Sequence, residues 1–542
     1  MSRLPRLRAL KHLSRPYHSI TPNVHDLLTQ PLAENGTTVS AHGWLKSIRR
    51  QKKVAFAVLS DGSDTVGLQA VFEDPAMTKS FTNGTAVQLS GELMHSRAAG
   101  QDREILVRKA TVVGQCDIQN YPIQKKALTN EYLRDNVHLR ARTDRIASML
   151  RLRSACSRLM HKEFEGMGFM HTHPPILTSS DCEGAGEAFR IASAPQRPSP
   201  SPDPDPELPA ESPSSSTSPL SPVATTDSEF FGRPAYLTVS SQLHLEALSW
   251  AMDRVYTLGP CFRAERSMTG RHLAEFWMLE AEWVLDQDHR HPTCHPPEEP
   301  AASPAICEEL TQICDVVERV LKGIIQPCFE PKTSLDRVLA KDITLLWNNS
   351  SIPTDRTEWL RKAAQSSDRW PLMTYSDAVD VLRSATLPTG TGSPFEFKPT
   401  WGEPLRSEHE RYLAEEIAQG PIFICNYPAS LKPFYMRAND PRETDGPNTG
   451  TVACFDLLVP GIGELAGGSV REERLPVLEA SLERVSEKWR EEYGWYADLR
   501  RYGGAPHGGF GVGFERLVSW ISGIESVREC IPIPRWTGRM DL

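Results

Sequence analysis

Hydrophobic and polar residues alternate most regularly between Leu258 and Trp283, where the sequence reads LGPCFRAERSMTGRHLAEFWMLEAEW. A strand-like run ends at an Arg–x–Glu pair, a polar loop containing glycine follows, and a second alternating run returns. Successive strand residues point to opposite sides of a sheet, so one side of the returning run suits a core. That side carries Trp277, Leu279, Ala281 and Trp283, and the other carries Phe276, Met278, Glu280 and Glu282. The pattern predicts two paired strands, with an aromatic ring and acidic groups beside the loop arginines.

The remaining pattern predicts two folded parts joined by a hinge. Five short β segments with turn signals lie between Thr38 and about Val113, which is typical of a closed barrel of the OB type. We place the barrel at residues 37–118 and the hinge at residues 119–144. Helical spacing of apolar residues from Arg145 to Glu165, followed by mixed helices and strands, predicts an α+β domain over residues 145–542.

Two segments interrupt the second part with compositions that do not suit a core. Residues 191–228 contain 10 Pro and 10 Ser in 38 positions, which predicts a disordered insertion. The segment from Asp286 to Pro300 holds His289, His291, Cys294 and His295. A metal site is one interpretation of these four residues. Their spacing matches no closed tetrahedral set, so a polar loop is favoured.

Composition narrows the class of protein. The 542 residues, with a hydrophobic content of 39% and a net charge of -9, suit two or more domains without a general nucleic-acid coat. No apolar run approaches the roughly 20 residues that cross a bilayer, so no membrane contact is expected. The 11 cysteines include no CxxC pair, which argues against a disulfide framework or a zinc ribbon.

The first 20 residues differ from the rest of the chain. Basic residues are spaced along a stretch that contains leucines, and no acidic residue precedes Asp26. A basic, acid-poor N-terminus is typical of a mitochondrial transit peptide, which predicts a location in the mitochondrial matrix. A disordered basic tail that contacts RNA is the alternative.

The loop arginines indicate a nucleotide site. Arg263 and Arg271 can bind phosphate oxygens in a bidentate manner, and the Phe276 ring can hold a base. For this segment alone, the alternative is a surface hairpin held by salt bridges.

A glycine-rich strand near the C-terminus is the second candidate for ligand binding. The string GGFGVGFERLVSWISGI predicts a strand that runs into an amphipathic helix with Leu517, Val518, Ile521 and Ile524 inward. Gly509, Gly511 and Gly513 would let a ligand lie against bare backbone, with Arg516 projecting toward it. A purely structural role for these glycines is the alternative.

Together these segments resemble the class II aminoacyl-tRNA synthetases. FRAE, RHLAEF and GFERL are similar to motifs 2 and 3 of that family, and GFMHTHPPIL is similar to motif 1. The strings TVSSQLHLEAL, YPASLKPFYMR and PGIGELAGGSVREERL resemble the asparaginyl branch, and the similarity runs from about residue 38 to 538. The resemblance implies an antiparallel catalytic sheet, bound ATP and Mg²⁺, an aminoacyl-adenylate, tRNA(Asn) as a partner, and a homodimer with Pro175 at its interface.

The resemblance also implies roles for residues at the ATP site. The implied ATP site comprises Arg263, Glu265, Arg271, His272, Phe276, Glu464 and Arg516, of which Arg263 and Arg516 are catalytic. Arg263 would contact the α-phosphate and the substrate carboxylate, while Phe276 and Arg516 would enclose the adenine ring. Glu265 would accept from the adenine amino group, and Arg271 and His272 would hold the outer phosphates. Asp456 and Glu464 would bind Mg²⁺, and an acidic pair at a sheet end is the alternative.

The choice of amino acid depends on one position. The implied asparagine site comprises Glu183, Gln242, Glu246, Glu280 and Arg471, with Glu183 and Glu280 facing the ammonium group. The aspartyl branch carries a lysine at the position of Leu245, where it pairs with the substrate carboxylate. Here that cation is absent and an acceptor, Glu246, follows. An amide NH₂ needs an acceptor whereas a second carboxylate would be repelled, so we predict L-asparagine as the substrate.

In the barrel, the resemblance places three residues at the middle base of the anticodon. These residues are Arg49, Phe56 and Gln69, next to a basic hairpin that suits single-stranded RNA. A plain core role is the alternative for Phe56.

The sequence therefore predicts an asparagine–tRNA ligase. The alternatives are an aspartate–tRNA ligase of relaxed specificity, an inactive RNA-binding paralogue, and a tRNA-independent amide-forming enzyme. Leu245 argues against the first, the intact site arginines against the second, and the barrel against the third.

Overall fold

The computed structural model divides into two compact units, Met1–Ala147 and Ser148–Leu542. The structure describes residues 20–32, 36–96, 101–179, 188–192, 230–267, 269–286, 306–348, 355–386, 393–439 and 450–542. The predicted transit peptide and insertion, and the four-residue histidine and cysteine group, fall almost entirely outside these ranges.

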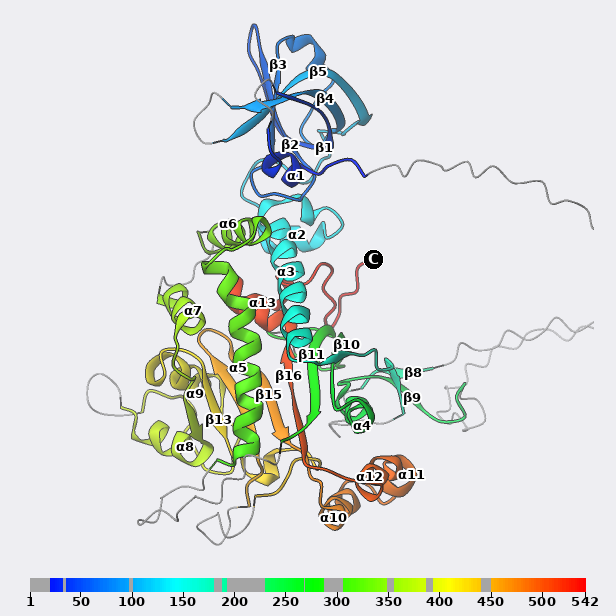
Figure 1. Ribbon diagram of the computed structural model, residues 1–542, viewed down its shortest axis with the longest axis vertical. Helices are drawn as coiled ribbons and strands as arrows, with labels where there is room; N and C mark the ends of the chain where they lie inside the picture. Colours follow the sequence, from blue (N-terminus) through cyan, green and yellow to red (C-terminus); the bar gives the residue numbers. More distant parts are fainter. Residues whose placement is uncertain are drawn as a thin grey trace, which may run out of the picture. The chain divides into compact units, whose positions relative to one another are not determined.

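The first unit contains a closed five-stranded barrel, as the β segments predicted (Figure 1). Its strands are β1 (Thr37–Arg50), β2 (Ala55–Ser60), β3 (Leu68–Phe72), β4 (Ala86–His95) and β5 (Arg103–Gly114), closed in the order β1-β2-β3-β5-β4. Alternate residues fill the interior, where Leu59 and Phe72 are fully buried. A β-bulge between Leu45 and Ser47 changes the register of β1 against β2. This unit also contains the short helices α1 (Val24–Thr29) and α2 (Asn130–Asp135).

The second unit is built on an eight-stranded sheet with the order β12-β13-β14-β15-β16-β11-β10-β6. Its strands are β6 (Met170–His171), β10 (Arg254–Phe262), β11 (Glu275–Val284), β12 (Leu372–Thr374), β13 (Ile422–Cys425), β14 (Cys454–Val459), β15 (Gly463–Val470) and β16 (His507–Gly513). All pairs are antiparallel except β12–β13 and β10–β6 at the two edges. The predicted antiparallel sheet is therefore confirmed for its interior. A separate small sheet contains β7 (Leu177–Thr178), β9 (Ala235–Leu237) and β8 (Arg190–Ile191).

The hairpin of β10 and β11 is the strand pair predicted from the alternating pattern. Leu279 and Ala281 are fully buried and Trp283 is only 6% exposed, so these residues lie in the core, whereas Trp277 on the same side is half-buried. The side with Phe276, Met278, Glu280 and Glu282 lines a cavity instead. The two-residue period of a strand thus separates core residues from site residues.

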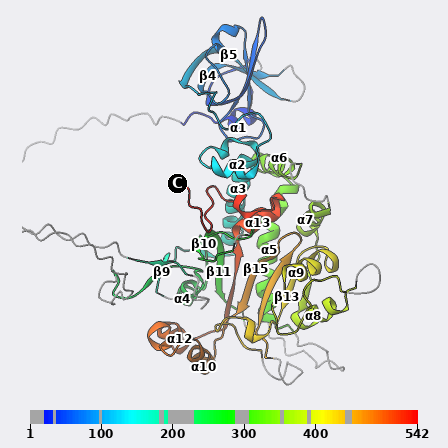
Figure 2. The same cartoon turned by 180° about the vertical axis from the view of Figure 1, so that it is seen from behind.

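Helices cover the sheet, and α5 (Glu308–Phe329) lies along it in both views of the ribbon (Figures 1 and 2). Its Ile313 side chain comes within 2.5 Å of where a Cβ on Gly508 would lie, so α5 packs directly on β16. The other helices of this unit are α3 (Asp144–Gly166, which begins in the first unit), α4 (Gln242–Met252), α6 (Ser334–Asn348), α7 (Asp355–Gln365), α8 (Tyr375–Ser384), α9 (Ser407–Tyr412), α10 (Leu475–Val485), α11 (Trp489–Glu492), α12 (Gly494–Arg501) and α13 (Phe514–Ser522).

Helix α13 follows β16 directly and has the inward face that its sequence predicted. Leu517, Val518 and Ile521 are fully buried, and Ile524 is 2% exposed. The helix ends at Gly523, whose φ of 69° is left-handed and favours glycine over residues with a Cβ. This connection fixes the position of Arg516 on the first turn, next to the end of β16.

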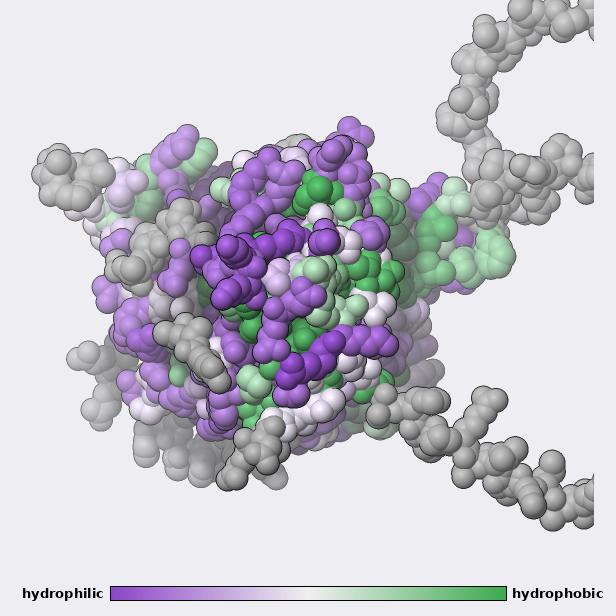
Figure 3. Space-filling model, turned by 90° about the horizontal axis from the view of Figure 1, so that it is seen from above, coloured by the Kyte–Doolittle hydropathy of each residue, from purple (hydrophilic) through white to green (hydrophobic). Residues whose placement is uncertain are grey.

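None of the described helices combines the length and apolar character needed to cross a membrane. The face drawn in Figure 3 is mainly hydrophilic and carries smaller hydrophobic groups.

Candidate active site

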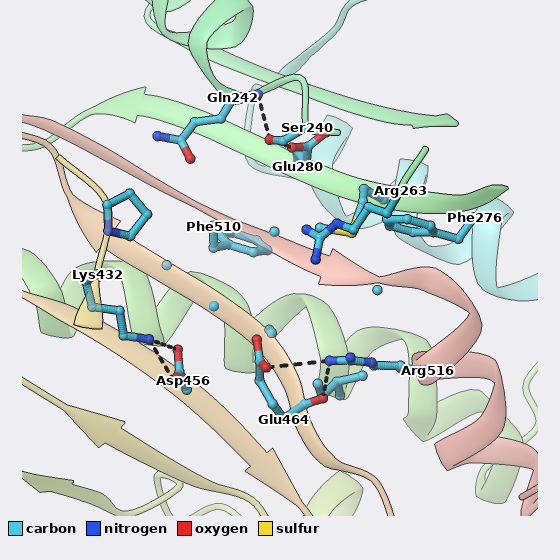
Figure 4. A pocket seen from close by; sticks show the side chains of 18 of the residues that line it. Ser240, Gln242, Arg263, Phe276, Glu280, Lys432, Asp456, Glu464, Phe510 and Arg516 are labelled. Carbon is cyan, nitrogen blue, oxygen red and sulfur yellow. Dashed lines mark hydrogen bonds and ion pairs between the residues drawn. The ribbon is translucent and has the colours of Figure 1, made fainter. Parts of the chain in front are cut away.

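A cavity of about 550 Å³ lies between the β10–β11 hairpin and strands β14 to β16 (Figure 4). Predicted site residues that line it are Gln242, Arg263, Glu265, Arg271, His272, Phe276, Glu280, Asp456, Glu464, Arg471 and Arg516. They come from distant segments of the chain, and the sheet brings them to one place. The cavity thus combines three arginines, Arg263, Arg271 and Arg516, with the buried carboxylate of Glu280.

Arg263 and Phe276 form one wall of the cavity. The Arg263 backbone N–H donates to Ala274 O at 3.0 Å, which closes the β10–β11 hairpin just before Phe276. This closure places the Arg263 guanidinium carbon 5.5 Å from the centroid of the Phe276 ring, a cation–π arrangement. Arg263 Nη1 also lies 3.8 Å from Glu265 Oε1. The wall therefore offers an aromatic face beside a fixed positive charge.

His272 lies in the loop of this hairpin, with Glu265 beside it. Its Nε2 is 3.3 Å from Glu265 Oε2, and its Nδ1 is 2.6 Å from Thr269 Oγ1. Burial, together with nearby arginines, lowers the pKa of His272 despite the opposing charge of Glu265. A neutral imidazole at pH 7 is the consequence. Its neighbour Arg271 donates from Nη1 to Ser407 Oγ at 2.9 Å and is thereby held against α9.

Arg516 and Phe276 come from different elements and both line the cavity (Figure 4). Arg516 Nη1 donates to the backbone oxygen of Glu464 at 2.9 Å and lies 3.6 Å from Glu464 Oε2. The resemblance implied that Phe276 and Arg516 enclose the adenine ring, and both side chains line the cavity. Arg263 rather than Arg516 covers the Phe276 ring in this structure.

The two carboxylates predicted to bind Mg²⁺ both line the cavity. Lys432 Nζ donates to Asp456 Oδ1 at 2.7 Å and to Oδ2 at 2.8 Å. Burial and the neighbouring Glu464 raise the pKa of Asp456 in spite of Lys432. Burial, Glu464 and Asp456 together raise the pKa of Glu410 to about 7. Three acidic side chains thus influence one another at this end of the site.

A metal ion here would need ligands beyond the protein. Within the described ranges, no three His, Cys, Asp or Glu side chains converge as a metal site. Two carboxylates such as Asp456 and Glu464 are sufficient for Mg²⁺, because this ion commonly takes one or two carboxylates and completes its octahedron with water and phosphate oxygens.

Glu280 forms the opposite end of the cavity and is held by the start of α4. Glu280 Oε1 and Oε2 each accept from the Ser241 N–H at 3.0 Å, and Ser240 Oγ donates to Oε1. The side chain is 4% exposed, and burial raises its pKa against the opposing effect of these hydrogen bonds. A carboxylate fixed in this way suits a cationic partner such as an ammonium group.

Glu246 does not line this cavity, in contrast to the prediction that it accepts directly from the substrate amide. It is fully buried one turn further along α4, behind Gln242. Its Oε1 accepts from Gln242 Nε2 at 3.0 Å, so Gln242 reaches the cavity and Glu246 supports it. Helical spacing placed the two residues on one face but could not show which of them is nearer the ligand.

Arg471 is buried between the carboxylates of Glu282 and Glu246. Its Nε donates to Glu282 Oε2 at 3.2 Å, and a second, shorter bond joins Nη2 to Glu282 Oε1. Burial opposes the charge of Arg471, but Glu282 and Glu246 raise its pKa further above its ordinary value. Glu282 is a site residue to which the sequence assigned no role, although the alternating pattern placed it on this side of β11.

The glycines of β16 have different roles. A Cβ on Gly509 would come within 2.1 Å of Ala281 O and 2.3 Å of Glu282 Cδ, so this glycine permits close packing against β11. Gly509 also does not line the cavity, which corrects its prediction as a ligand contact. Gly511 and Gly513 do line it, near Met278 and Arg516 respectively.

Lys432 is another lining residue that the sequence did not single out. Its string, YPASLKPFYMR, was noted only as part of a resemblance. Lys432 directly follows η5 (Ala429–Leu431), and Asp456 lies on β14. Their ion pair is a tertiary contact that no local sequence pattern reveals. Glu183, predicted at the ammonium group, lies outside the described residues.

In the barrel, the three residues predicted for the anticodon lie near one another on the outer side. Arg49 of β1 is paired with Phe56 of β2, and Val58 of β2 is paired with Gln69 of β3. Arg49 is exposed, while Phe56 and Gln69 are half-buried. Phe56 is absent from the barrel core, so the alternative that it is a plain core residue is not favoured.

Pro175, predicted at a dimer interface, is exposed at the surface. The next two residues, Ile176 and Leu177, are 42% and 45% exposed. Exposed apolar residues in a row are compatible with a covered surface in an assembly.

Comparisons with known proteins agree with this geometry. The family described as tRNA synthetases class II (D, K and N) matches residues 129–199, 206–292 and 305–537, and an OB-fold nucleic acid binding domain matches residues 39–113. Asparaginyl-tRNA synthetase from Mus musculus is 38% identical over 528 residues, which cover 96% of this chain and 95% of that protein. Asparagine–tRNA ligase from Pelobacter propionicus is 38% identical over 516 residues, covering 94% and 98%.

Solved structures give the same result. Asparaginyl-tRNA synthetase from Pyrococcus horikoshii, complexed with asparaginyl-adenylate, has a TM-score of 0.70 and 27% identity, covering 93% of this chain and 96% of that chain.

An antiparallel sheet that carries an arginine-lined cavity, together with an OB barrel, defines a class II aminoacyl-tRNA synthetase. Within that class, the asparaginyl enzymes compared above are 38% identical to this chain over 94% or more of its length. The chain belongs to the asparaginyl-tRNA synthetase family.

Proposed function

We propose that the cavity forms asparaginyl-adenylate from L-asparagine and ATP, and that the asparaginyl group then passes to the 3′ end of tRNA(Asn). The observation that carries this proposal is a single cavity that combines two sets of groups. Arg263, Arg271 and Arg516 suit phosphates, and Glu280, Gln242 and Arg471 suit an amino acid. The nucleotide would contact the first set, and the amino acid would contact the second.

In the first step, an oxygen of the asparagine α-carboxylate attacks the α-phosphorus of ATP, and pyrophosphate leaves with the electrons of the broken P–O bond. The carboxylate, with a reference pKa of about 3.5, is already ionised at pH 7, so no general base is needed. Arg263 would neutralise the charge that develops on the α-phosphate, and Arg271 would hold the departing phosphates. The reaction then depends on orientation and on fixed positive charge.

In the second step, the 3′-hydroxyl of the terminal adenosine attacks the asparaginyl carbonyl carbon, and AMP leaves. The half-buried aromatic residue Phe56, together with Arg49 and Gln69, would hold the middle anticodon base at the barrel. These contacts bind the anticodon and take no part in the chemistry.

Mg²⁺ fits the Asp456 and Glu464 end of the site. Burial, together with the neighbouring carboxylates of Glu464 and Asp456, raises the pKa of Glu410, and a bound dication would relieve the repulsion among the three groups. The ion would supply charge neutralisation for the outer phosphates. Lys432, which is paired with Asp456, would keep that carboxylate in place.

The assay for the proposal is trapping of the intermediate. The full chain is incubated with ATP, Mg²⁺ and L-asparagine without tRNA, and the acid-quenched mixture is analysed for asparaginyl-AMP by mass spectrometry. We expect asparaginyl-AMP in amounts close to the enzyme concentration. Its absence, in protein that still binds ATP, would contradict the proposed chemistry.

Two further properties are proposed on narrower grounds. The exposed row at Pro175, Ile176 and Leu177 supports a homodimer, which sedimentation equilibrium would detect.

The basic N-terminal segment supports import into the mitochondrial matrix, because its composition suits a transit peptide. Fusion of the first 30 or so residues to a fluorescent protein tests import, and diffuse fluorescence in the cytosol would contradict it.

A further inference from the structure

Glu246 is the centre of a buried hydrogen-bond network that the proposed chemistry does not use. Its Oε2 accepts from Tyr496 Oη at 2.7 Å, from Arg500 Nη2 at 2.9 Å and lies 2.9 Å from His507 Nε2. Its other oxygen accepts from Gln242 at 3.0 Å. The side chains of Glu246, Arg500 and His507 are completely buried. A buried carboxylate with this many donors is held in one position.

The partners of Glu246 come from parts of the chain far from it in sequence. Tyr496 and Arg500 lie on α12, one turn apart, and His507 begins β16. Tyr496 belongs to a core cluster that also includes Leu243 of α4 and Leu478 of α10. Packing of the α10–α12 helices on α4 therefore brings the two donors of α12 to Glu246.

The network keeps Glu246 ionised. Burial acts to raise the pKa of Glu246, but the charge of Arg500, the hydrogen bond and charge of His507, and Arg471 bring it below its ordinary value. Burial also raises the pKa of Tyr496, so its hydroxyl remains a donor. An ionised Glu246 offers acceptors only.

An acceptor behind Gln242 determines which way the Gln242 amide faces. The amide nitrogen donates to Glu246, so the oxygen is left for the cavity, and Figure 4 shows the Gln242 side chain extending into it. Turning the amide over would set its oxygen against the carboxylate and lose this hydrogen bond. The orientation of Gln242 is therefore a consequence of the charge on Glu246.

Arg471 lies next to the Gln242 amide. Its Nε is 3.8 Å from Glu246 Oε1, the same oxygen to which Gln242 donates. The cavity thus presents an acceptor, Gln242 Oε1, beside a donor, the Arg471 guanidinium. A primary amide has one donor group and one acceptor and matches this pair, whereas a carboxylate has two acceptors and no donor.

We propose that Tyr496, Arg500 and His507 are positioning residues for amino-acid selection, acting through Glu246 to hold Gln242 with its oxygen toward the substrate. They contact neither the substrate nor ATP, and their effect is on the choice between an amide and a carboxylate. The inference rests on the proposed activation of asparagine and names the residues that make the amide end selective.

The test uses Tyr496→Phe and Glu246→Gln in the full chain. Tyr496→Phe removes one hydrogen bond and keeps the ring on which Arg500 lies, 4.1 Å from its centroid. Glu246→Gln removes the charge that fixes Gln242. The matched control is Tyr375→Phe, which removes another buried tyrosine hydroxyl, bonded at 2.7 Å to Glu403 O. Each variant is assayed by ATP–pyrophosphate exchange with asparagine and with aspartate.

We expect KM for asparagine to rise roughly tenfold in Tyr496→Phe and roughly a hundredfold in Glu246→Gln, with KM for ATP within about twofold. The preference for asparagine over aspartate should fall at least about tenfold in Glu246→Gln. Tyr375→Phe should change neither KM nor preference. Arg500→Lys, which keeps a positive charge, should retain more of the preference than Arg500→Met.

Two results would overturn the inference. One is an unchanged KM for asparagine in Glu246→Gln, and the other is an equal rise in both KM values, as general destabilisation would produce. Failure of the proposed function is a separate outcome, because the unaltered chain would then show no exchange with asparagine at all.

Discussion

Replacement of Gly509 by alanine tests whether this glycine serves packing or ligand binding. The added Cβ would lie 2.1 Å from Ala281 O and 2.3 Å from Glu282 Cδ, far inside the closest normal contact. The first atom is backbone of the paired strand β11, and Glu282 is held by Arg471, so neither can move away easily. Overpacking in a core costs about 1–3 kcal/mol, and we expect Gly509→Ala to reach or exceed the upper value.

The matched control is Gly513→Ala on the same strand. There the nearest atoms are side-chain carbons of Arg516 at 3.4 to 3.6 Å, an ordinary contact. The residue has a φ of -67°, which alanine adopts without strain. Urea unfolding followed by circular dichroism should show a large loss of stability for Gly509→Ala and a change below about 1 kcal/mol for Gly513→Ala. A stable Gly509→Ala protein whose only defect is a raised KM for ATP would refute the reasoning.

Three other changes have clear expected outcomes. Arg263→Ala should lower the rate of asparagine-dependent ATP–pyrophosphate exchange by at least about a hundredfold. The unfolding free energy should change by less than about 1 kcal/mol, because the side chain is partly exposed. Exchange at the rate of the unaltered chain would contradict the role of Arg263. Phe56→Ala should raise KM for tRNA about 5- to 150-fold without changing exchange, since one stacked base contributes about 1–3 kcal/mol; an unchanged KM for tRNA would exclude stacking there. The lowered pKa of Glu246 stabilises the fold above the ordinary glutamate pKa, and this contribution is lost as pH falls below about 4.5. The difference in unfolding free energy between the unaltered chain and Glu246→Gln should therefore shrink between pH 6 and about pH 3.5, and a constant difference would argue against an ionised Glu246.

Much of the catalytic sheet and barrel could be predicted from local patterns. Alternation along β11 separated Leu279 and Ala281 in the core from Glu280 and Glu282 in the cavity, because a strand has a period of two. Helical spacing likewise identified the buried side of α13. These patterns depend only on which side of one element faces the core.

The order of residues behind the cavity wall could not be predicted in this way. Gln242 and Glu246 share a helix face, but only the packing of α12 on α4 shows that Glu246 lies behind Gln242. Lys432 and Asp456 form an ion pair between two separate segments of the chain. A glycine is needed at Gly509 because the side chain of Glu282 on the neighbouring strand leaves no space for a Cβ. Each of these relations is set by tertiary contacts, which a single strand or helix pattern does not contain.

The most direct measurement of the proposed function is ATP–pyrophosphate exchange by the purified full chain, with L-asparagine and L-aspartate compared at equal concentrations. We expect exchange that depends on asparagine and requires Mg²⁺, with little or none supported by aspartate. Exchange supported equally well or better by aspartate would contradict the amide-selective end of the cavity, and no exchange with either amino acid would contradict the proposed activation itself.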